Sequence, residues 1–349
     1  MAAERIESPP QSGPLSRANA ALGRAAGIPA VRYAALGVLA ALVVALPFMA
    51  GSNYIIRVGI TAGIYIILSL GLNIVVGYCG LLDLGYVAFY ALGAYVYAFL
   101  ASPHFGVHWP WFAVLPISIM VPAIFGVLLG IPVLRLRGDY LAIVTLGFGE
   151  IIRLFLNNLD RVTNGPKGIA NLDKVNLFGF QFSTPTRYYY LVFFFVLLGI
   201  VAIRRLGRSR IGRAWGAIRE DQEAAKAIGL NTHSLKLRAF AMGASFAGIA
   251  GILFAGFQGF VSPESFTFGE SVIIFCMITL GGMGSIPGAI LGSIILVLLP
   301  EVLRPIADYR MLFYGLLLVL VMTQRPQGLW PSKQRRRELV EADEAGREQ

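Results

Sequence analysis

Charged side chains are scarce in this chain: Asp, Glu, Lys and Arg make up 14% of its 349 residues, whereas apolar residues make up 56%. A soluble domain carries about a quarter charged residues, so this composition argues against one. The mean hydropathy is +0.70, and apolar runs such as 34–50 and 188–203 approach the length of about 17–25 residues with which a helix crosses a bilayer. The sequence does not show the short segments of alternating apolar and polar residues that are typical of a closed β-barrel. The sequence therefore predicts an all-α, polytopic integral membrane protein.

Cysteine and histidine are also rare. Cys79 and Cys276 lie in apolar surroundings without metal-ligand or redox spacing, so both are interpreted as small buried hydrophobic residues. The three histidines, His104, His108 and His233, fall outside the predicted spans, so no cluster that combines His with Asp or Glu lies at membrane depth. An intramembrane enzyme is therefore disfavoured, and we expect no metal and no cofactor in this chain.

Two functional segments are missing. A phosphate-binding Gly-x-x-x-x-Gly-Lys-Ser/Thr motif does not occur, so any ATP hydrolysis must come from another polypeptide. Residues 1–30 have no apolar core followed by a small-residue cleavage site, which argues against a removed signal peptide. We expect residues 1–30 to be a disordered N-terminal segment, residues 31–323 to form the transmembrane domain and residues 324–349 to form a C-terminal tail.

Ten apolar segments are candidate spans, although glycine-rich parts that re-enter would reduce the count to eight or nine. The segments are 31–50, 55–77, 85–101, 111–134, 139–156, 188–203, 239–258, 270–283, 288–304 and 310–323. Nine Lys and Arg residues lie in the loop 204–238 and six follow residue 323, whereas the predicted external segments hold only Arg161, Lys167, Lys174 and Arg187. Basic residues collect in cytoplasmic loops, so both termini are predicted to be cytoplasmic. The same bias explains the net charge of +10 without nucleic-acid binding.

Two glycine-rich segments interrupt the spans and resemble each other. We call residues 77–85 the first glycine break and residues 281–288 the second glycine break. Broken helices in a membrane are tolerated only where protein or a water-filled cavity surrounds them, so the breaks either line or hinge a translocation path or simply permit tight packing. The candidate residues within the breaks are Gly77, Gly80, Asp83, Gly85, Gly281, Gly282 and Gly284.

Asp83 and three further polar residues in or near the spans are candidates for the path, and each has a structural alternative. Asp83 could instead cap the helix that follows it. Glu150 lies three residues before Arg153, so the two side chains are expected to pair on one helical face. Asn73 and Thr145 could instead be packing or turn residues.

The loop 204–238 is the longest polar stretch between spans. Its middle predicts one amphipathic helix from Ile211 to Gly229, outside the bilayer and free to dock into another protein. One face of that helix carries Ile211, Trp215, Ile218, Ala225 and Ile228, interrupted only by Gln222.

The segment Glu223-Ala224-Ala225-x-x-x-Gly229 resembles the EAA signature of permease subunits in ABC importers, where this helix couples the permease to an ATPase. The broader signature continues with isoleucine, one spacer residue and then leucine-proline. This chain has Ala239, Ala241 and Met242 at those positions instead. Four other segments closely resemble LivM-type permeases of branched-chain amino acid ABC importers over about residues 55–330: they are 71–95, 134–151, 163–169 and 281–288.

The resemblance implies a permease in the bacterial inner membrane, among lipids, without a nucleotide site of its own. It implies four partners: a second permease of the LivH type, two cytoplasmic ATPases that bind ATP and Mg²⁺, and a periplasmic amino-acid-binding protein. The residues that it implies for coupling to the ATPase are Arg213, Trp215, Arg219, Glu220, Glu223, Ala224, Ala225 and Gly229.

Two alternatives remain open at this stage. Related permeases move urea, amides or other small amino acids, and the sequence does not decide among these or among leucine, isoleucine and valine. An ion-coupled secondary transporter would need a buried acid, for which Glu150 is the best candidate. In such a transporter the amphipathic loop 204–238 would have no evident function.

Overall fold

The computed structural model describes residues 52–133, 138–177 and 180–302, together with residues 47, 315, 316, 319, 323 and 328–330. The chain divides into residues 1–55 and 56–349, and the architecture below is that of the second unit. The predicted N-terminal segment 1–30 and the span 31–50 lie outside the described residues apart from Pro47. Only isolated residues of the span 310–323 and of the tail 324–349 are described.

All eight predicted spans that fall on described residues are helices. They are α3 (Asn53–Leu72) with the π-helix η1 (Asn73–Tyr78), α4 (Val87–Leu100), α5 (Trp111–Val133), α6 (Asp139–Asn158), α8 (Pro185–Arg208), α11 (Thr232–Gln258), α12 (Phe268–Gly281) and α13 (Ile286–Val302). By length and composition, five described segments can cross a membrane: Asn53–Tyr78, α5, α8, α11 and Pro263–Gly281; α4 and α13 are shorter apolar helices. The predicted all-α, polytopic fold is confirmed.

Helix α11 begins at Thr232, seven residues before the predicted span. The Asn231 side chain accepts a hydrogen bond from the Ser234 backbone N–H at 3.1 Å, which is a typical N-cap. The first two turns of this helix are polar and lack the apolar composition of a span. The prediction therefore placed the boundary too late.

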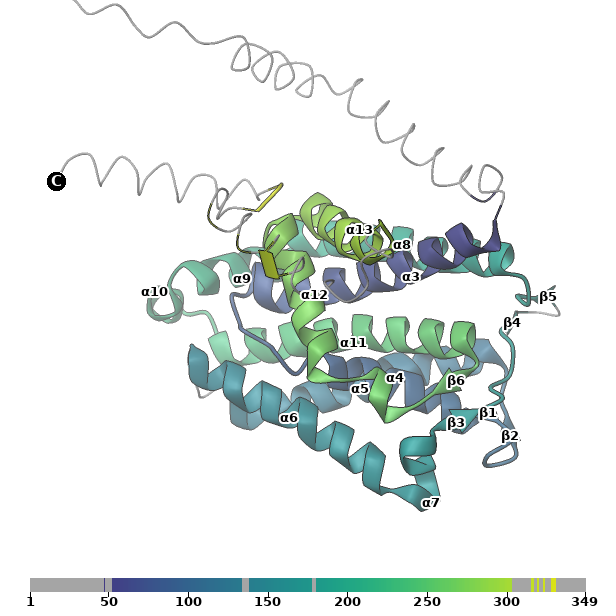
Figure 1. Cartoon of the computed structure of the whole chain (residues 1–349). Helices are drawn as coiled ribbons and strands as arrows, with labels where there is room; N and C mark the ends of the chain where they lie inside the picture. Colours follow the sequence, from purple (N-terminus) through teal and green to yellow (C-terminus); the bar gives the residue numbers. More distant parts are fainter. Residues whose placement is uncertain are drawn as a thin grey trace, which may run out of the picture. The chain divides into compact units, whose positions relative to one another are not determined.

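Short elements connect the long helices. The helical ones are α7 (Asp160–Thr163), α9 (Arg210–Glu220), α10 (Gln222–Ala227) and the 3₁₀ turns η2 (Gly165–Lys167) and η3 (Pro263–Ser265). The strands are β1 (Ala101–Ser102), β2 (Val107–His108), β3 (Ile169–Ala170), β4 (Asn176–Leu177), β5 (Phe180–Gln181) and β6 (Phe260–Val261). They form three antiparallel pairs, β1–β2, β3–β6 and β4–β5. Figure 1 shows all six strands at one end of the helices and α9 and α10 at the other.

Helix α11 lies alongside α4 and α5 (Figure 1) because small residues let the backbones approach closely. A Cβ added at Gly93 of α4 would come within 2.6 Å of the Gly248 Cα in α11. A Cβ added at Gly251 would come within 2.5 Å of the Tyr90 carbonyl oxygen of α4. The backbones of α4 and α11 are therefore in close contact at these glycines.

Candidate functional site

The predicted helix 211–229 is two helices, so the expectation of one continuous helix was wrong. Asp221 lies between α9 and α10 with an extended backbone, φ −150° and ψ 116°. Its carboxylate oxygen Oδ1 accepts hydrogen bonds from the N–H groups of Glu223, at 2.7 Å, and Ala224, at 3.1 Å. A short Asp side chain competes for backbone donors in this way, which ends one helix and begins the next.

The apolar face of this α9–α10 pair is turned into the chain. Trp215 is fully buried, and its indole N–H donates to the Leu235 carbonyl oxygen of α11 at 2.8 Å. Ile218 and Ala225 are also buried, whereas Ile228, predicted on the same face, is 74% exposed because it lies beyond the end of α10. Trp215 and Ala225, implied by resemblance to contact a partner, therefore pack inside this chain.

The opposite face of the α9–α10 pair is exposed. Glu223 forms an ion pair with Lys226 at 3.2 Å, and one Arg213 guanidinium N–H donates to the Arg208 carbonyl oxygen at 2.8 Å. Gly229 adopts φ +85° with no atom within 4 Å of a Cβ built there, so it ends the helix pair with open space around it. The predicted coupling residues on this face are Arg213, Glu220, Glu223, Ala224 and Gly229.

Arg219 is the predicted coupling residue that reaches the transmembrane part of the fold. Its guanidinium Nη1 donates to the carbonyl oxygen of Gly77 at 2.6 Å. Gly77 lies in η1, whose π-helical turn leads into the unwound residues 79–86. The α9–α10 pair and the first glycine break are therefore in direct contact.

The first glycine break is held against α6. The Leu84 backbone N–H donates to the Thr145 hydroxyl oxygen at 3.1 Å, and a Cβ at Gly85 would overlap the Thr145 carbonyl oxygen. Asp83 is buried, and its Oδ1 accepts from the Gly85 N–H at 3.0 Å, so it stabilises a turn just before α4 rather than capping the helix itself. Its other carboxylate oxygen has no hydrogen-bond partner among the described residues.

The second glycine break is a tight turn between α12 and α13. Gly282 adopts φ +117° and Gly284 adopts φ +80°, conformations that residues with a Cβ rarely adopt. A Cβ at Gly281 would overlap the Gly288 carbonyl oxygen, so the two helix ends are in backbone contact. The described residues 328–330 pair with this turn: Trp330 N–H donates to the Gly281 carbonyl oxygen at 2.8 Å.

The two glycine breaks meet at Asn73. Asn73 is fully buried in η1, and its Oδ1 accepts from the Gly284 backbone N–H at 2.8 Å. A Cβ at Gly77 would come within 2.6 Å of the same Gly284 nitrogen. Residues 211 positions apart are thus joined, which sequence spacing alone does not indicate.

The structure sorts the predicted path residues into two clusters and one isolated pair. Asn73 and Gly77 lie together with the second glycine break, and Asp83 and Gly85 lie together with Thr145. Glu150 pairs with Arg153 at 2.9 Å as predicted, with about a third of each side chain exposed. Gly80 is exposed and adjoins Arg219 instead.

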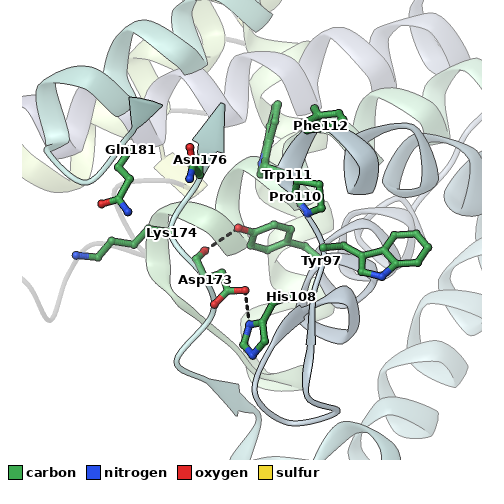
Figure 2. A pocket seen from close by; sticks show the side chains of 10 residues that line it. Tyr97, His108, Pro110, Trp111, Phe112, Asp173, Lys174, Asn176 and Gln181 are labelled. Atoms are coloured by element: carbon green, nitrogen blue, oxygen red, sulfur yellow. Dashed lines mark hydrogen bonds and ion pairs between the residues drawn. The ribbon is translucent and has the colours of Figure 1, made fainter. Parts of the chain in front are cut away.

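A pocket that the sequence did not predict lies at the strand end of the fold and has a volume of about 600 Å³. Figure 2 shows Tyr97 and His108 pointing toward Asp173: the Tyr97 hydroxyl donates to its carbonyl oxygen at 2.7 Å, and the His108 ring lies 2.7 Å from its carboxylate. Its lining residues are Tyr97, His108, Trp109, Pro110, Trp111, Phe112, Asp173, Lys174, Asn176 and Gln181. They come from α4, from the start of α5 and from the strands and loops at this end of the fold, without a sequence motif, and no candidate path residue is among them.

A family model described as "Branched-chain amino acid transport system / permease component" matches residues 54–322. The "High-affinity branched-chain amino acid transport system permease protein LivM" of Escherichia coli strain K12 is 48% identical over 316 residues, which covers 84% of this chain and 73% of the relative.

Two more distant relatives cover 78% of this chain. The E. coli LivH permease protein of the same transport system is 26% identical, with 92% of its length covered. The "Probable branched-chain amino acid transport permease protein LivM" of Methanocaldococcus jannaschii is 25% identical, with 91% covered. No solved structure matches. The apolar helices, the glycine breaks and the match over most of the chain lead to one assignment: this multi-pass membrane protein belongs to the permease family of branched-chain amino acid transport systems.

Proposed function

We propose that this chain is a permease subunit of an ATP-binding-cassette importer that moves leucine, isoleucine and valine across the bacterial inner membrane. The observation that carries this proposal is the 48% identity, over 84% of the chain, to a permease protein of a branched-chain amino acid transport system. In this scheme both chain termini and the α9–α10 pair are cytoplasmic, because the Lys and Arg residues collect there.

The importer needs partners that supply energy and selectivity. A LivH-type permease completes the membrane path, and its likeness to this chain at 26% identity supports a paired arrangement. Two ATPases bind ATP and Mg²⁺, since the sequence of this chain has no phosphate-binding loop. A periplasmic binding protein selects the amino acid, so this chain requires only weak substrate contacts and no cofactor.

The exposed face of the α9–α10 pair is the proposed docking surface for an ATPase. It offers Arg213, Glu220 and Glu223 for orientation, and Ala224 and Gly229 for close approach. Trp215 and Ala225 anchor the pair to the rest of the chain from inside. Binding of a partner at this surface therefore acts on a body that is already attached to α11.

Transport follows from two states of the membrane helices. ATP-driven approach of the two ATPases displaces the α9–α10 pairs, and the cavity opens to one side of the membrane at a time. The energy for the switch comes from contacts that differ between the states. The first glycine break is the proposed point at which the helices rearrange, because its unwound backbone is not tied into continuous helical hydrogen bonding.

The test replaces Gly229 by Trp in the complete importer reconstituted in vesicles. An indole at this open position prevents close approach of the ATPase, so we expect leucine uptake to fall by about tenfold or more while the permease still inserts. Gly259→Trp is the matched control, because Gly259 also has positive φ and open space around it but ends α11 at the strand end. Normal uptake by the Gly229→Trp variant contradicts the docking role.

A second measurement tests the class of substrate and the source of energy. Uptake of labelled leucine by the reconstituted importer should be inhibited by vanadate and by excess isoleucine or valine, but not by urea or by an ionophore. Inhibition by an ionophore alone would support the ion-coupled alternative. Competition by urea or amides would reassign the substrate within the same family.

A further inference from the structure

We propose that Arg219 is a positioning residue that transmits movement of the α9–α10 pair to both glycine breaks. This inference rests on the proposed function, because it concerns how force from an ATPase reaches the membrane helices. The path runs from the Arg219 guanidinium to the Gly77 carbonyl, and from the Asn73 and Gly77 turn to Gly284.

The first link is a bond to a carbonyl at the end of the π-helix. The carbonyl groups at the end of a helix have no partner in the next turn. Here the carbonyl oxygens of residues 74, 75 and 76 accept from the backbone N–H groups of Cys79, Leu81 and Gly80. The following carbonyl, that of Gly77, accepts from Arg219 at 2.6 Å. A hydrogen bond from a charged donor is stronger than a neutral one, so this contact is suited to transmit force.

Gly80 of the first break makes room for the Arg219 side chain. A Cβ at Gly80 would come within 2.9 Å of the Arg219 Cγ, so any larger residue there would displace the stem of the side chain. Gly80 also adopts φ +72°, which favours glycine for a second reason. The break is therefore shaped around a side chain that α9 supplies.

The second link joins the two breaks. The Gly77 turn lies against the Gly284 nitrogen, which itself donates to the Asn73 Oδ1 at 2.8 Å. Asn73 and Gly77 are in the same π-helical segment, so displacement of Gly77 moves the acceptor that holds the second break. The buried position of Asn73 leaves little space for the contact to relax.

The α9–α10 pair is also held from the side of α11. The Trp215 indole N–H donates to the Leu235 carbonyl oxygen at 2.8 Å, and the Lys236 ammonium donates to the Gln222 amide oxygen at 2.6 Å. Because the pair has these attachments to α11, a push on its exposed face turns it as one body. Arg219 is the contact through which that motion reaches η1.

The experiment measures leucine molecules transported per ATP hydrolysed by the complete importer in vesicles. For Arg219→Gln we expect the ATPase to remain bound and active while this ratio falls about tenfold, within the range of ordinary coupling energies. Arg219→Lys keeps a charged donor but loses the planar guanidinium, so an intermediate ratio is expected. Arg210→Gln is the matched control, because Arg210 lies on the same helix, is exposed and is not part of the proposed docking surface.

The ratio separates transmission from a local capping role. A structural cap changes how much folded importer is obtained but not how many molecules each ATP moves. A wild-type ratio in the Arg219→Gln variant, or equal losses in the Arg219→Gln and Arg210→Gln variants, overturns the inference. Should Arg219→Gln fail to assemble, a wild-type ratio in Arg219→Lys overturns it. Failure of the wild-type chain to bind any ATPase would instead refute the proposed function.

Discussion

The two glycine breaks look alike in the sequence but are built differently. The first contains the last two residues of a π-helix and the unwound residues 79–85, and side chains from α6 and α9 hold it. The second is a turn in which the ends of α12 and α13 touch through their own backbones at Gly281 and Gly288. In the first break Gly80 leaves room for the Arg219 side chain and Gly85 lets the α6 backbone approach, whereas in the second break Gly281 lets two consecutive helix ends touch.

The difference assigns the breaks different mechanical roles. A segment whose position depends on side chains of other elements moves when those elements move. A turn closed by backbone contact behaves as a rigid unit, because interiors packed at this density have few gaps to absorb a shift. We therefore expect changes in the second break to affect folding and changes in the first to affect transport.

The largest effect is expected from Gly281→Val. A Cβ at this position overlaps the Gly288 carbonyl oxygen, so the α12–α13 turn cannot close. Overpacking of this kind lowers the free energy of unfolding by about 1–3 kcal/mol or more. We therefore expect a lower yield of folded protein and a lower thermal unfolding temperature in detergent. Gly147→Val is the control, because no atom lies within 4 Å of a Cβ there. Equal unfolding temperatures for both variants would contradict the rigid-turn interpretation.

An intermediate effect is expected from Asn73→Leu, which removes the hydrogen bond between the breaks. The Gly284 N–H then loses its acceptor in a partly buried site, which destabilises by about 1 kcal/mol. We expect the variant to fold with a modestly lower unfolding temperature and a larger relative loss of leucine uptake. Asn158→Leu, at an exposed position near the end of α6, should change uptake little. Wild-type uptake by Asn73→Leu would show that the breaks act independently.

The smallest effect is expected from Asp83→Asn. An amide oxygen can still accept from the Gly85 N–H, so the turn before α4 is kept. Asp83→Ala loses this acceptor and should lower the free energy of unfolding by about 1 kcal/mol. Normal uptake with Asn and a stability loss only with Ala support the turn role. Strongly reduced uptake with Asn would instead place the Asp83 charge in the translocation path.

The sequence was a good guide to the helices and a partial guide to the site. Apolar composition located eight described helices within a few residues at most ends, because a bilayer-length apolar run is a strong signal. The α9–α10 break was missed because apolar periodicity continued through Asp221, whereas the capping of Glu223 and Ala224 by its carboxylate is a local competition. The inward direction of Trp215 was also missed, because an amphipathic face looks the same whether its partner is internal or external.

Composition and residue order alone determined that this chain is an α-helical membrane protein with two glycine breaks and an amphipathic loop. Solubility and helix formation depend on the local balance of apolar and polar residues, so they can be derived without knowing which segments meet. Only the tertiary structure decided that Asn73 holds Gly284 and that Arg219 reaches Gly77. Such contacts depend on how distant helices pack against each other, and hydrogen bonds between residues so far apart leave no periodic signal in the chain.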